Sequence, residues 1–263
     1  MGVLLESKDV CKYFGGLKAV EKVNMTVNEG DIFGIIGPNG AGKTTFFNIC
    51  SGIYQPTSGA VLFQGRDISR KSPDEIAKLG ISRTFQNIQL FKFMSVIDNV
   101  KIGFHLSTKT NVFDAMLHTR RYRQDEEFVK RESKIVLEKV GLEEYADTLA
   151  GNLPYGVQRK VEIARALALN PKVILLDEPA AGMNPNETNS LREFIIRLNC
   201  EGYTIIVIEH DMKFVMNSCN RILVLNFGQK IFEGTPNEVR KDPDVNEAYF
   251  GKAGALKGDD SVC

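Results

Sequence analysis

The chain has 263 residues, which is enough for one large domain or two small ones with a sizeable core. Hydrophobic residues make up 43% and charged residues 25%, as expected of an ordinary globular protein. Its 33 Lys and Arg residues balance 33 Asp and Glu residues, so no overall positive charge attracts nucleic acid, and we expect no nucleic-acid partner.

The N-terminal segment, residues 1–6, has neither a basic region nor a sustained apolar core, so we expect no secretory signal and a cytoplasmic location. Short apolar runs then alternate with turns, which predicts strands. The expected strands are Leu4–Val10, Val23–Val27, Asp31–Ile36 and Ala60–Phe63. Ser72 and Glu75 form a capping-box pattern around Pro73, which predicts a helix to about Leu79, followed by a strand at Ile81–Phe85.

From residue 96 onward the pattern of the sequence changes from short predicted strands to predicted helices. Residues 96–140 contain no Pro, and their charged and apolar pattern predicts a helical insert. Beyond Gly156, helices and strands alternate, which predicts a parallel sheet covered on both faces. The expected elements are a helix to Leu169, a strand at Val173–Leu176, a helix at Asn186–Cys200, a strand at Thr204–Ile208, a further helix and a strand at Arg221–Leu225. The small and polar tail, residues 252–263, is expected to be disordered.

A phosphate-binding loop is predicted between the strand at Ile32–Ile36 and a helix that runs to about Ser51. The sequence there is Gly37-Pro38-Asn39-Gly40-Ala41-Gly42-Lys43-Thr44, which matches G-x-x-x-x-G-K-[ST]. Glycines let backbone N–H groups surround the phosphates, and Lys43 neutralises the β- and γ-phosphates. The Thr44 hydroxyl is a candidate Mg²⁺ ligand. The alternative is a structural glycine turn, but the loop predicts ATP and Mg²⁺ as cofactors.

Acidic residues follow two apolar strands. Asp177 ends one of them and fits the carboxylate that holds Mg²⁺ in phosphate-loop NTPases. Glu178 is expected to face the opposite way, because successive strand residues alternate, and to activate the water that attacks the γ-phosphate. The alternative is a solvated acidic strand end. His210, after the strand at Thr204–Ile208, is a candidate donor to the γ-phosphate.

Together these residues resemble the ATP-binding subunits of ABC transporters, from about Leu4 to Gly251. The resemblance implies that Phe14 stacks on adenine, that Thr45 extends the phosphate site, and that Gln86 is the Q-loop glutamine, which acts in catalysis and as a Mg²⁺ ligand with Thr44 and Asp177. It also identifies His210 as the switch histidine. The implied fold class is α/β: a phosphate-loop NTPase core with a mostly parallel sheet, an N-terminal antiparallel β subdomain and an inserted helical subdomain.

The place of the signature motif, which contacts the nucleotide of a partner subunit, is occupied by Leu153, Tyr155, Gly156, Val157 and Gln158. The usual sequence is Leu-Ser-Gly-Gly-Gln. Here Pro154, Tyr155 and Val157 replace the Ser, the first Gly and the Gln, so the sequence lacks the serine hydroxyl that makes one γ-phosphate contact in the family. The D-loop aspartate is also replaced, by Asn184.

Within the family, the sequence is most similar to the larger of the two ATPases of branched-chain amino-acid importers. The similarity lies in residues 85–91, 177–185, 242–251 and a long insert near 104–131. Lipopolysaccharide-export and urea-import ATPases share parts of this pattern and are alternatives. Two other classes, a soluble ABC ATPase of translation or DNA repair and a non-hydrolysing nucleotide-binding regulator, are disfavoured by the single cassette and by the complete set of catalytic residues.

The resemblance implies a single cassette at residues 1–251 with its helical subdomain at about 87–165. It also implies a peripheral position on the cytoplasmic face of the membrane. The implied partners are two integral-membrane permease subunits, a second ATPase subunit that is different or identical, and, indirectly, an extracytoplasmic substrate-binding protein.

Overall fold

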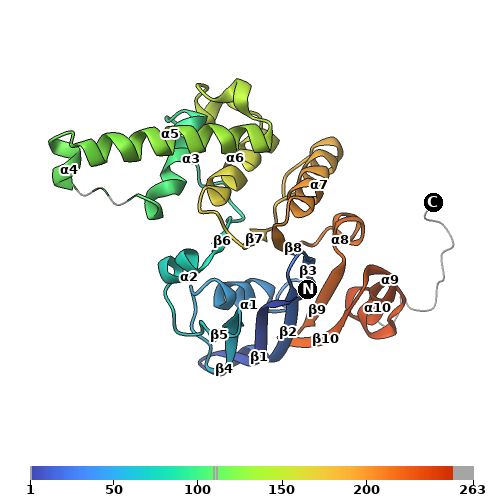
Figure 1. Cartoon of the computed structure of the whole chain (residues 1–263). Helices are drawn as coiled ribbons and strands as arrows, with labels where there is room; N and C mark the ends of the chain where they lie inside the picture. The colour runs from blue at the N-terminus through green and yellow to red at the C-terminus, as the bar shows by residue number, and fades with distance from the viewer. Residues whose placement is uncertain (1, 109, 111, 251–263) are drawn as a thin grey trace.

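A computed structural model describes residues 2–108, 110 and 112–250 (Figure 1). The tail that was expected to be disordered, residues 252–263, lies outside the described residues. The described part contains two sheets. A four-stranded antiparallel sheet has the order β2-β1-β4-β5, and a six-stranded sheet has the order β10-β9-β3-β8-β7-β6. Within the second sheet only the β10–β9 pair is antiparallel, which agrees with the expected mostly parallel sheet.

The strands of the antiparallel sheet are β1 (Val3–Phe14), β2 (Leu17–Asn28), β4 (Ser58–Phe63) and β5 (Arg66–Asp67). The six-stranded sheet contains β3 (Ile32–Ile36), β6 (Ile81–Arg83), β7 (Val173–Asp177), β8 (Thr204–Ile208), β9 (Arg221–Asn226) and β10 (Gln229–Gly234). Every residue of β3, β7 and β8 is buried, as continuous apolar runs in a covered parallel sheet require.

The helices near the sheets are α1 (Lys43–Cys50), α2 (Pro73–Leu79), α7 (Pro185–Cys200), α8 (Met212–Ser218), α9 (Pro236–Lys241) and α10 (Pro243–Phe250). The six-stranded sheet is a middle layer with a separate core on each face. Residues at alternate positions along β7 and β8 pack with α1 and the antiparallel sheet on one face, and with α7 and α8 on the other. This alternation places Asp177 on the α1 face.

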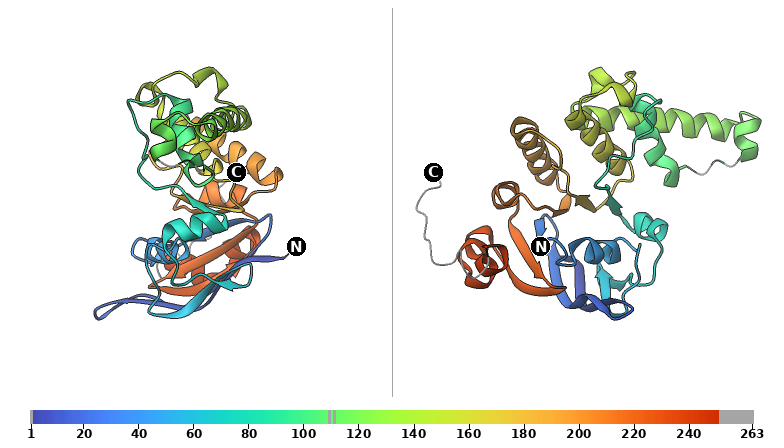
Figure 2. Two further views of the ribbon diagram at one scale, coloured as in Figure 1. Left: turned by 60° about the vertical axis from the view of Figure 1, so that its left-hand side comes forward. Right: turned by 180° about the vertical axis from the view of Figure 1, so that it is seen from behind.

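A helical arm extends away from both sheets, as the three views show (Figure 2). It contains α3 (Val96–Gly103), α4 (Val112–Met116), α5 (Arg120–Val140) and α6 (Tyr155–Leu167), with short 3₁₀ turns at Phe104–Leu106, Glu143–Tyr145 and Ala150–Asn152. Apolar residues of α3, α5 and α6 pack together, which stabilises the arm. None of the helices in the described ranges has the length and apolar character needed to span a bilayer.

Several expected boundaries were wrong. The strand expected at Ile81–Phe85 ends at Arg83, and the helix expected to reach Leu169 ends at Leu167. The sequence analysis also missed β10, α9 and α10. The strand β10 lies at the edge of its sheet and has only two large apolar residues, Ile231 and Phe232, so its sequence lacks the apolar run that marks the central strands.

Arg159 on α6 ties the arm to the segment that follows β6. Its side chain is 0% exposed and pairs with Glu162 at 2.6 Å. It also donates to the backbone carbonyl oxygens of Phe85 and Gln86, each at 2.7 Å. A buried guanidinium is tolerated only where such partners compensate for lost hydration.

We expect Arg159→Ala to lower the free energy of unfolding by about 3–5 kcal/mol, because it leaves Glu162 buried without its partner. Urea unfolding followed by circular dichroism measures the loss. Arg131→Ala is the control: Arg131 pairs with Glu132 on the surface, so its loss should stay within about 0.5 kcal/mol. Similar losses for the two variants would contradict this assignment.

Candidate functional site

The carboxyl ends of three parallel strands meet at one edge of the six-stranded sheet. In the register of the sheet, Ile208 on β8 lies beside Ile35 on β3 and beside Asp177 on β7. The phosphate loop and Glu178 each follow one of these strands directly, and His210 is the second residue after β8. The topology therefore brings together residues that are up to 173 positions apart, from Gly37 to His210, at the edge where ligands bind in open α/β sheets.

Two glycines of the phosphate loop leave no room for a side chain. Gly42 is the N-cap of α1 with a left-handed backbone (φ +94°), and a Cβ there would lie 2.4 Å from the Ala19 carbonyl oxygen. At Gly37 a Cβ would lie 2.2 Å from the Leu225 carbonyl oxygen. The loop is thus pressed against neighbouring backbone, and its N–H groups are held at the start of α1.

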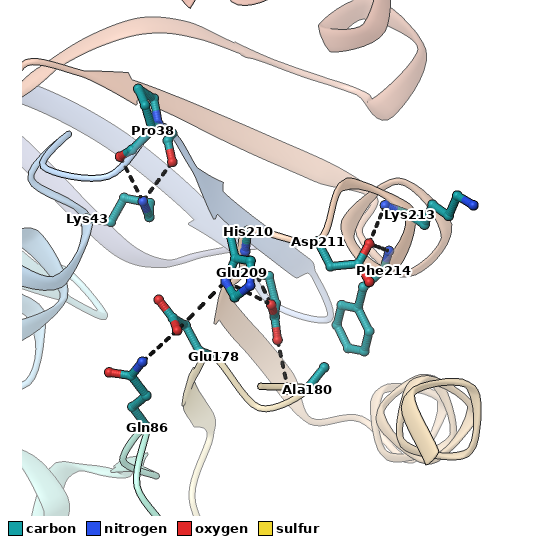
Figure 3. A network of polar contacts seen from close by, with 11 residues as sticks. Pro38, Lys43, Gln86, Glu178, Ala180, Glu209, His210, Asp211, Lys213 and Phe214 are labelled. Atoms are coloured by element: carbon teal, nitrogen blue, oxygen red, sulfur yellow. Dashed lines mark hydrogen bonds and ion pairs between the residues drawn. The ribbon is translucent and has the colours of Figure 1, made fainter. Parts of the chain in front are cut away.

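Lys43 is buried and lies across the loop, where its Nζ donates to the carbonyl oxygens of Gly37 at 2.7 Å and Pro38 at 3.0 Å (Figure 3). Burial lowers the pKa of the Lys43 ammonium, and the negative charge of Glu178 opposes that shift. The ammonium is therefore bound to the loop carbonyls, and the charge of Glu178 favours its protonated form.

A cavity of about 380 Å³ opens over the loop. It is lined by Asn39 to Thr45, with Glu178 also on its wall. Sequence analysis missed its remaining lining residues, which are Leu17, Lys18, Ala19 and Phe227. The aromatic ring of Phe227 is 85% exposed, in a turn with positive φ, which is an unusual place for a large apolar residue.

Phe14 lies at the end of β1, outside the lining of this cavity. Its ring packs edge-on against Tyr54 with the centroids 5.4 Å apart, and Lys12 Nζ lies 5.2 Å from its centroid. Both contacts fix the orientation of a partly exposed ring. The adenine-stacking role of Phe14 remains a prediction.

Glu178 does not continue β7, so the reasoning from strand alternation was wrong for this residue. The strand ends at Asp177, and Glu178 has a left-handed backbone (φ +43°) that redirects its side chain. Its Oε2 accepts a hydrogen bond from Gln86 Nε2 at 2.7 Å and lies 3.8 Å from His210 Nδ1 (Figure 3). The three residues predicted to act in catalysis are therefore in contact through one carboxylate oxygen.

Glu209, between β8 and His210, was not predicted as a site residue. It is buried, and its carboxylate accepts hydrogen bonds from the backbone N–H groups of Ala180 at 2.8 Å and His210 at 3.2 Å (Figure 3). Burial raises the pKa of Glu209, and these two bonds counter the shift. Glu209 thus fixes the turn after β7 against the start of the His210 segment.

Asp177 and Arg83 form a buried ion pair, with 2.7 Å between Asp177 Oδ2 and Arg83 Nη2. Sequence analysis missed Arg83, because nothing near it in the sequence reveals a carboxylate 94 positions away. Thr44 is exposed at the start of α1. Thr44, Gln86 and Asp177 provide hydroxyl, amide and carboxylate oxygens, the ligand type that Mg²⁺ prefers.

The predicted signature residues lie around the start of α6 and do not line the cavity over the phosphate loop. Pro154 is the N-cap and makes no side-chain capping bond. Gln158 Nε2 donates to the Leu153 carbonyl oxygen at 2.8 Å, which closes the turn before the helix. Tyr155 is exposed, and Gly156 and Val157 follow it in the first turn.

Residues 20–181 match the family of ABC transporters, and residues 229–255 match the family described as branched-chain amino acid ATP-binding cassette transporter. The chain belongs to the ABC transporter family. It is 44% identical over 251 residues to the high-affinity branched-chain amino acid transport ATP-binding protein LivG of Salmonella typhimurium, covering 95% of this chain and 98% of the relative. It is 43% identical over 251 residues to BraF of Pseudomonas aeruginosa, which carries the same description, with the same coverage.

Solved structures of ATP-binding cassettes from ABC transporters are similar to this chain. A crystal structure of the ADP conformation of an ATP-binding cassette superposes with a TM-score of 0.83 at 35% identity, covering 96% of this chain and all 100% of that one. A nucleotide-free cassette gives 0.82 at 35% identity, covering 95% of this chain and 100% of that one. These likenesses confirm the predicted family and fold class, and the cassette is an ATP-binding ATPase.

We expect Gly42→Ala to abolish nucleotide binding, because its Cβ collides with the Ala19 backbone at the start of α1. Titration with a fluorescent ATP analogue measures binding. Gly141→Ala is the matched control, since Gly141 also has positive φ (+67°) but open space around it. The control should lose about 1–2 kcal/mol of stability through backbone strain and bind nucleotide normally. Normal binding by Gly42→Ala would contradict the role of this close approach.

Proposed function

We propose that this chain is the ATP-hydrolysing motor subunit of an ABC importer of branched-chain amino acids. The observation that carries hydrolysis is the contact of Gln86 and His210 with one oxygen of Glu178 beside the phosphate loop. The amino-acid substrate is supported by the description of the relatives and by the family matched at residues 229–255. In this proposal residues 1–251 form one cassette, with the helical subdomain at about 87–165.

The phosphate loop would bind the nucleotide. Backbone N–H groups at the start of α1 point toward the phosphates, and Lys43 neutralises their charge. Phe14 would stack on adenine, and Thr45 would extend the phosphate contacts. Thr44, Gln86 and Asp177 would hold Mg²⁺, which neutralises phosphate charge when it is bound.

Glu178 would accept a proton from, or orient, the water that attacks the γ-phosphate. Gln86 donates its amide N–H to the Glu178 carboxylate, so one oxygen of that carboxylate is held in place. His210 lies beside the same carboxylate oxygen and would donate to the γ-phosphate. Preorganised groups of this kind supply most of the catalysis in phosphoryl transfer, because the protein contributes positioning and charge.

The proposed partners are two integral-membrane permease subunits, a second ATPase subunit and, indirectly, an extracytoplasmic substrate-binding protein. The cassette would lie on the cytoplasmic face of the membrane. An exposed apolar surface follows Gln86, where Phe93 is 94% exposed and Phe91 is also exposed. Exposed aromatic residues that are grouped on one surface are typical of a site that a partner covers.

We expect Lys43→Ala to abolish ATP binding and Glu178→Gln to preserve it while stopping turnover, because binding and water activation belong to different residues. Steady-state phosphate release and nucleotide binding are measured in parallel. The loss of turnover in Glu178→Gln should be about 10²-fold or more.

The control for this pair is Glu193→Gln, which removes a carboxylate that is exposed on α7 and should leave turnover unchanged. Turnover above about a tenth of wild type in Glu178→Gln would show that Glu178 is not the catalytic base.

We expect the two ATP sites of the working dimer to be unequal. This chain would give its partner a signature with backbone N–H groups at α6 but with no hydroxyl at Pro154. One hydrogen bond to a charged group contributes about 1.5–3 kcal/mol, so the partner's site should be roughly tenfold to a hundredfold weaker. ATPase and transport are measured with the Glu-to-Gln change placed in one subunit at a time. Equal losses from the two changes, or unchanged turnover in Pro154→Ser, would contradict the asymmetry.

A further inference from the structure

Arg83, the last residue of β6, has an unusual position for an arginine. Its side chain is 9% exposed, and that of its partner Asp177 is 8% exposed. The guanidinium carbon lies 5.0 Å from the centroid of the Phe47 ring and 5.4 Å from that of the Phe85 ring. Both distances are within the range of a cation–π interaction, which favours the charged guanidinium at this position.

The two terminal nitrogens of Arg83 bind different elements. Nη2 donates to Asp177 Oδ2 at 2.7 Å, at the end of β7. Nη1 donates to Asn48 Oδ1 at 2.7 Å and Ser51 Oγ at 2.6 Å, at the end of α1. Arg83 therefore connects the helix that begins at the phosphate loop with the strand that ends at the proposed Mg²⁺ ligand.

This connection has a geometric consequence for the carboxylate. Arg83 occupies one oxygen of Asp177, and Oδ1 is the oxygen that the bond leaves to other ligands. Thr44 and Asn48 lie on the same short helix, so fixing Asn48 against Arg83 also fixes the distance between the Thr44 hydroxyl and Asp177. Groups that orient a ligating carboxylate govern metal affinity as strongly as many ligands do.

We propose that Arg83 is a positioning residue that holds Asp177 and α1 in the arrangement that binds Mg²⁺ together with nucleotide. This inference rests on the proposed function. In this role Arg83 acts through the residues that it binds, which are Asp177, Asn48 and Ser51.

If Arg83 were only a counter-ion of Asp177, its removal would change Mg²⁺ affinity in the opposite direction. A positive charge beside a metal ligand repels a divalent cation, so removing it would tighten Mg²⁺ binding. A positioning role predicts weaker binding. Arg83→Lys separates the two roles, because lysine keeps the charge but cannot bind three partners from one rigid plane.

The experiment is calorimetric titration of the full chain with ADP, once with Mg²⁺ and once with EDTA. The ratio of the two dissociation constants measures the gain from Mg²⁺. For Arg83→Met we expect this ratio to fall by about 10- to 100-fold, while ADP affinity in EDTA stays at the wild-type value. For Arg83→Lys we expect this ratio to fall as well. Arg221→Met is the matched control, because Arg221 pairs with Glu233 at the opposite end of the sheet, and its ratio should not change.

An unchanged or increased ratio in Arg83→Met, or full rescue by Arg83→Lys, would overturn the proposal. If Arg83→Met does not fold, the double change Asn48→Ala with Ser51→Ala removes the tie to α1 while it leaves the ion pair, and it should also lower the ratio. An unchanged ratio in that variant would overturn the proposal as well. Failure of the proposed nucleotide and Mg²⁺ site can be told apart from failure of this proposal, because the wild-type chain would then bind ADP no more tightly with Mg²⁺ than with EDTA.

Discussion

The parallel alignment of β3, β8 and β7 is the constraint on which the site depends. Their paired ends place the phosphate loop, Glu178 and His210 on one sheet edge, although these segments are distant in the sequence. A shift of one residue in this register would turn every side chain to the opposite face, moving Asp177 away from α1. The apolar residues that alternate along these strands pack into two different cores, one on each face of the sheet. A shift in register would move each of these side chains into the core that it does not fit, so packing in both cores opposes the shift. Core packing thus sets the position of the catalytic groups.

Three carboxylates at this edge differ in their partners. Asp177 pairs with a guanidinium, Glu178 accepts from the Gln86 amide, and Glu209 accepts from two backbone N–H groups. Only Glu178 lines the cavity. A carboxylate that is committed to backbone donors holds a turn in place, whereas one held by a single amide keeps an oxygen for a proton from water. The partners, more than the sequence positions, distinguish structural from chemical roles.

The sequence was sufficient for the features whose signals are local. The pattern of the phosphate loop is contiguous and lies between β3 and α1, as expected from the sequence. The buried strands β7 and β8 are marked by runs of apolar residues, so these two strands were located correctly. The edge strand β10 has no such run and was missed. Arg83 and Glu209 were missed because their importance lies in partners that only the fold brings near. The direction of Glu178 depends on one left-handed residue at the strand end, which propensity does not predict for glutamate.

Arg159 joins the arm to the segment that follows β6 through two hydrogen bonds, to the backbone carbonyl oxygens of Phe85 and Gln86. It lies on α6 four positions after Tyr155, so the predicted signature and the anchor of the Gln86 backbone belong to the same rigid helix. Gln86 in turn holds Glu178. A displacement of α6 by nucleotide bound in a partner subunit would therefore move the Gln86 backbone relative to the fixed end of β7. The geometry of the Glu178 carboxylate would then depend on what the start of α6 contacts, and in the proposed dimer occupation of one site would alter the chemistry of the other through these hydrogen bonds.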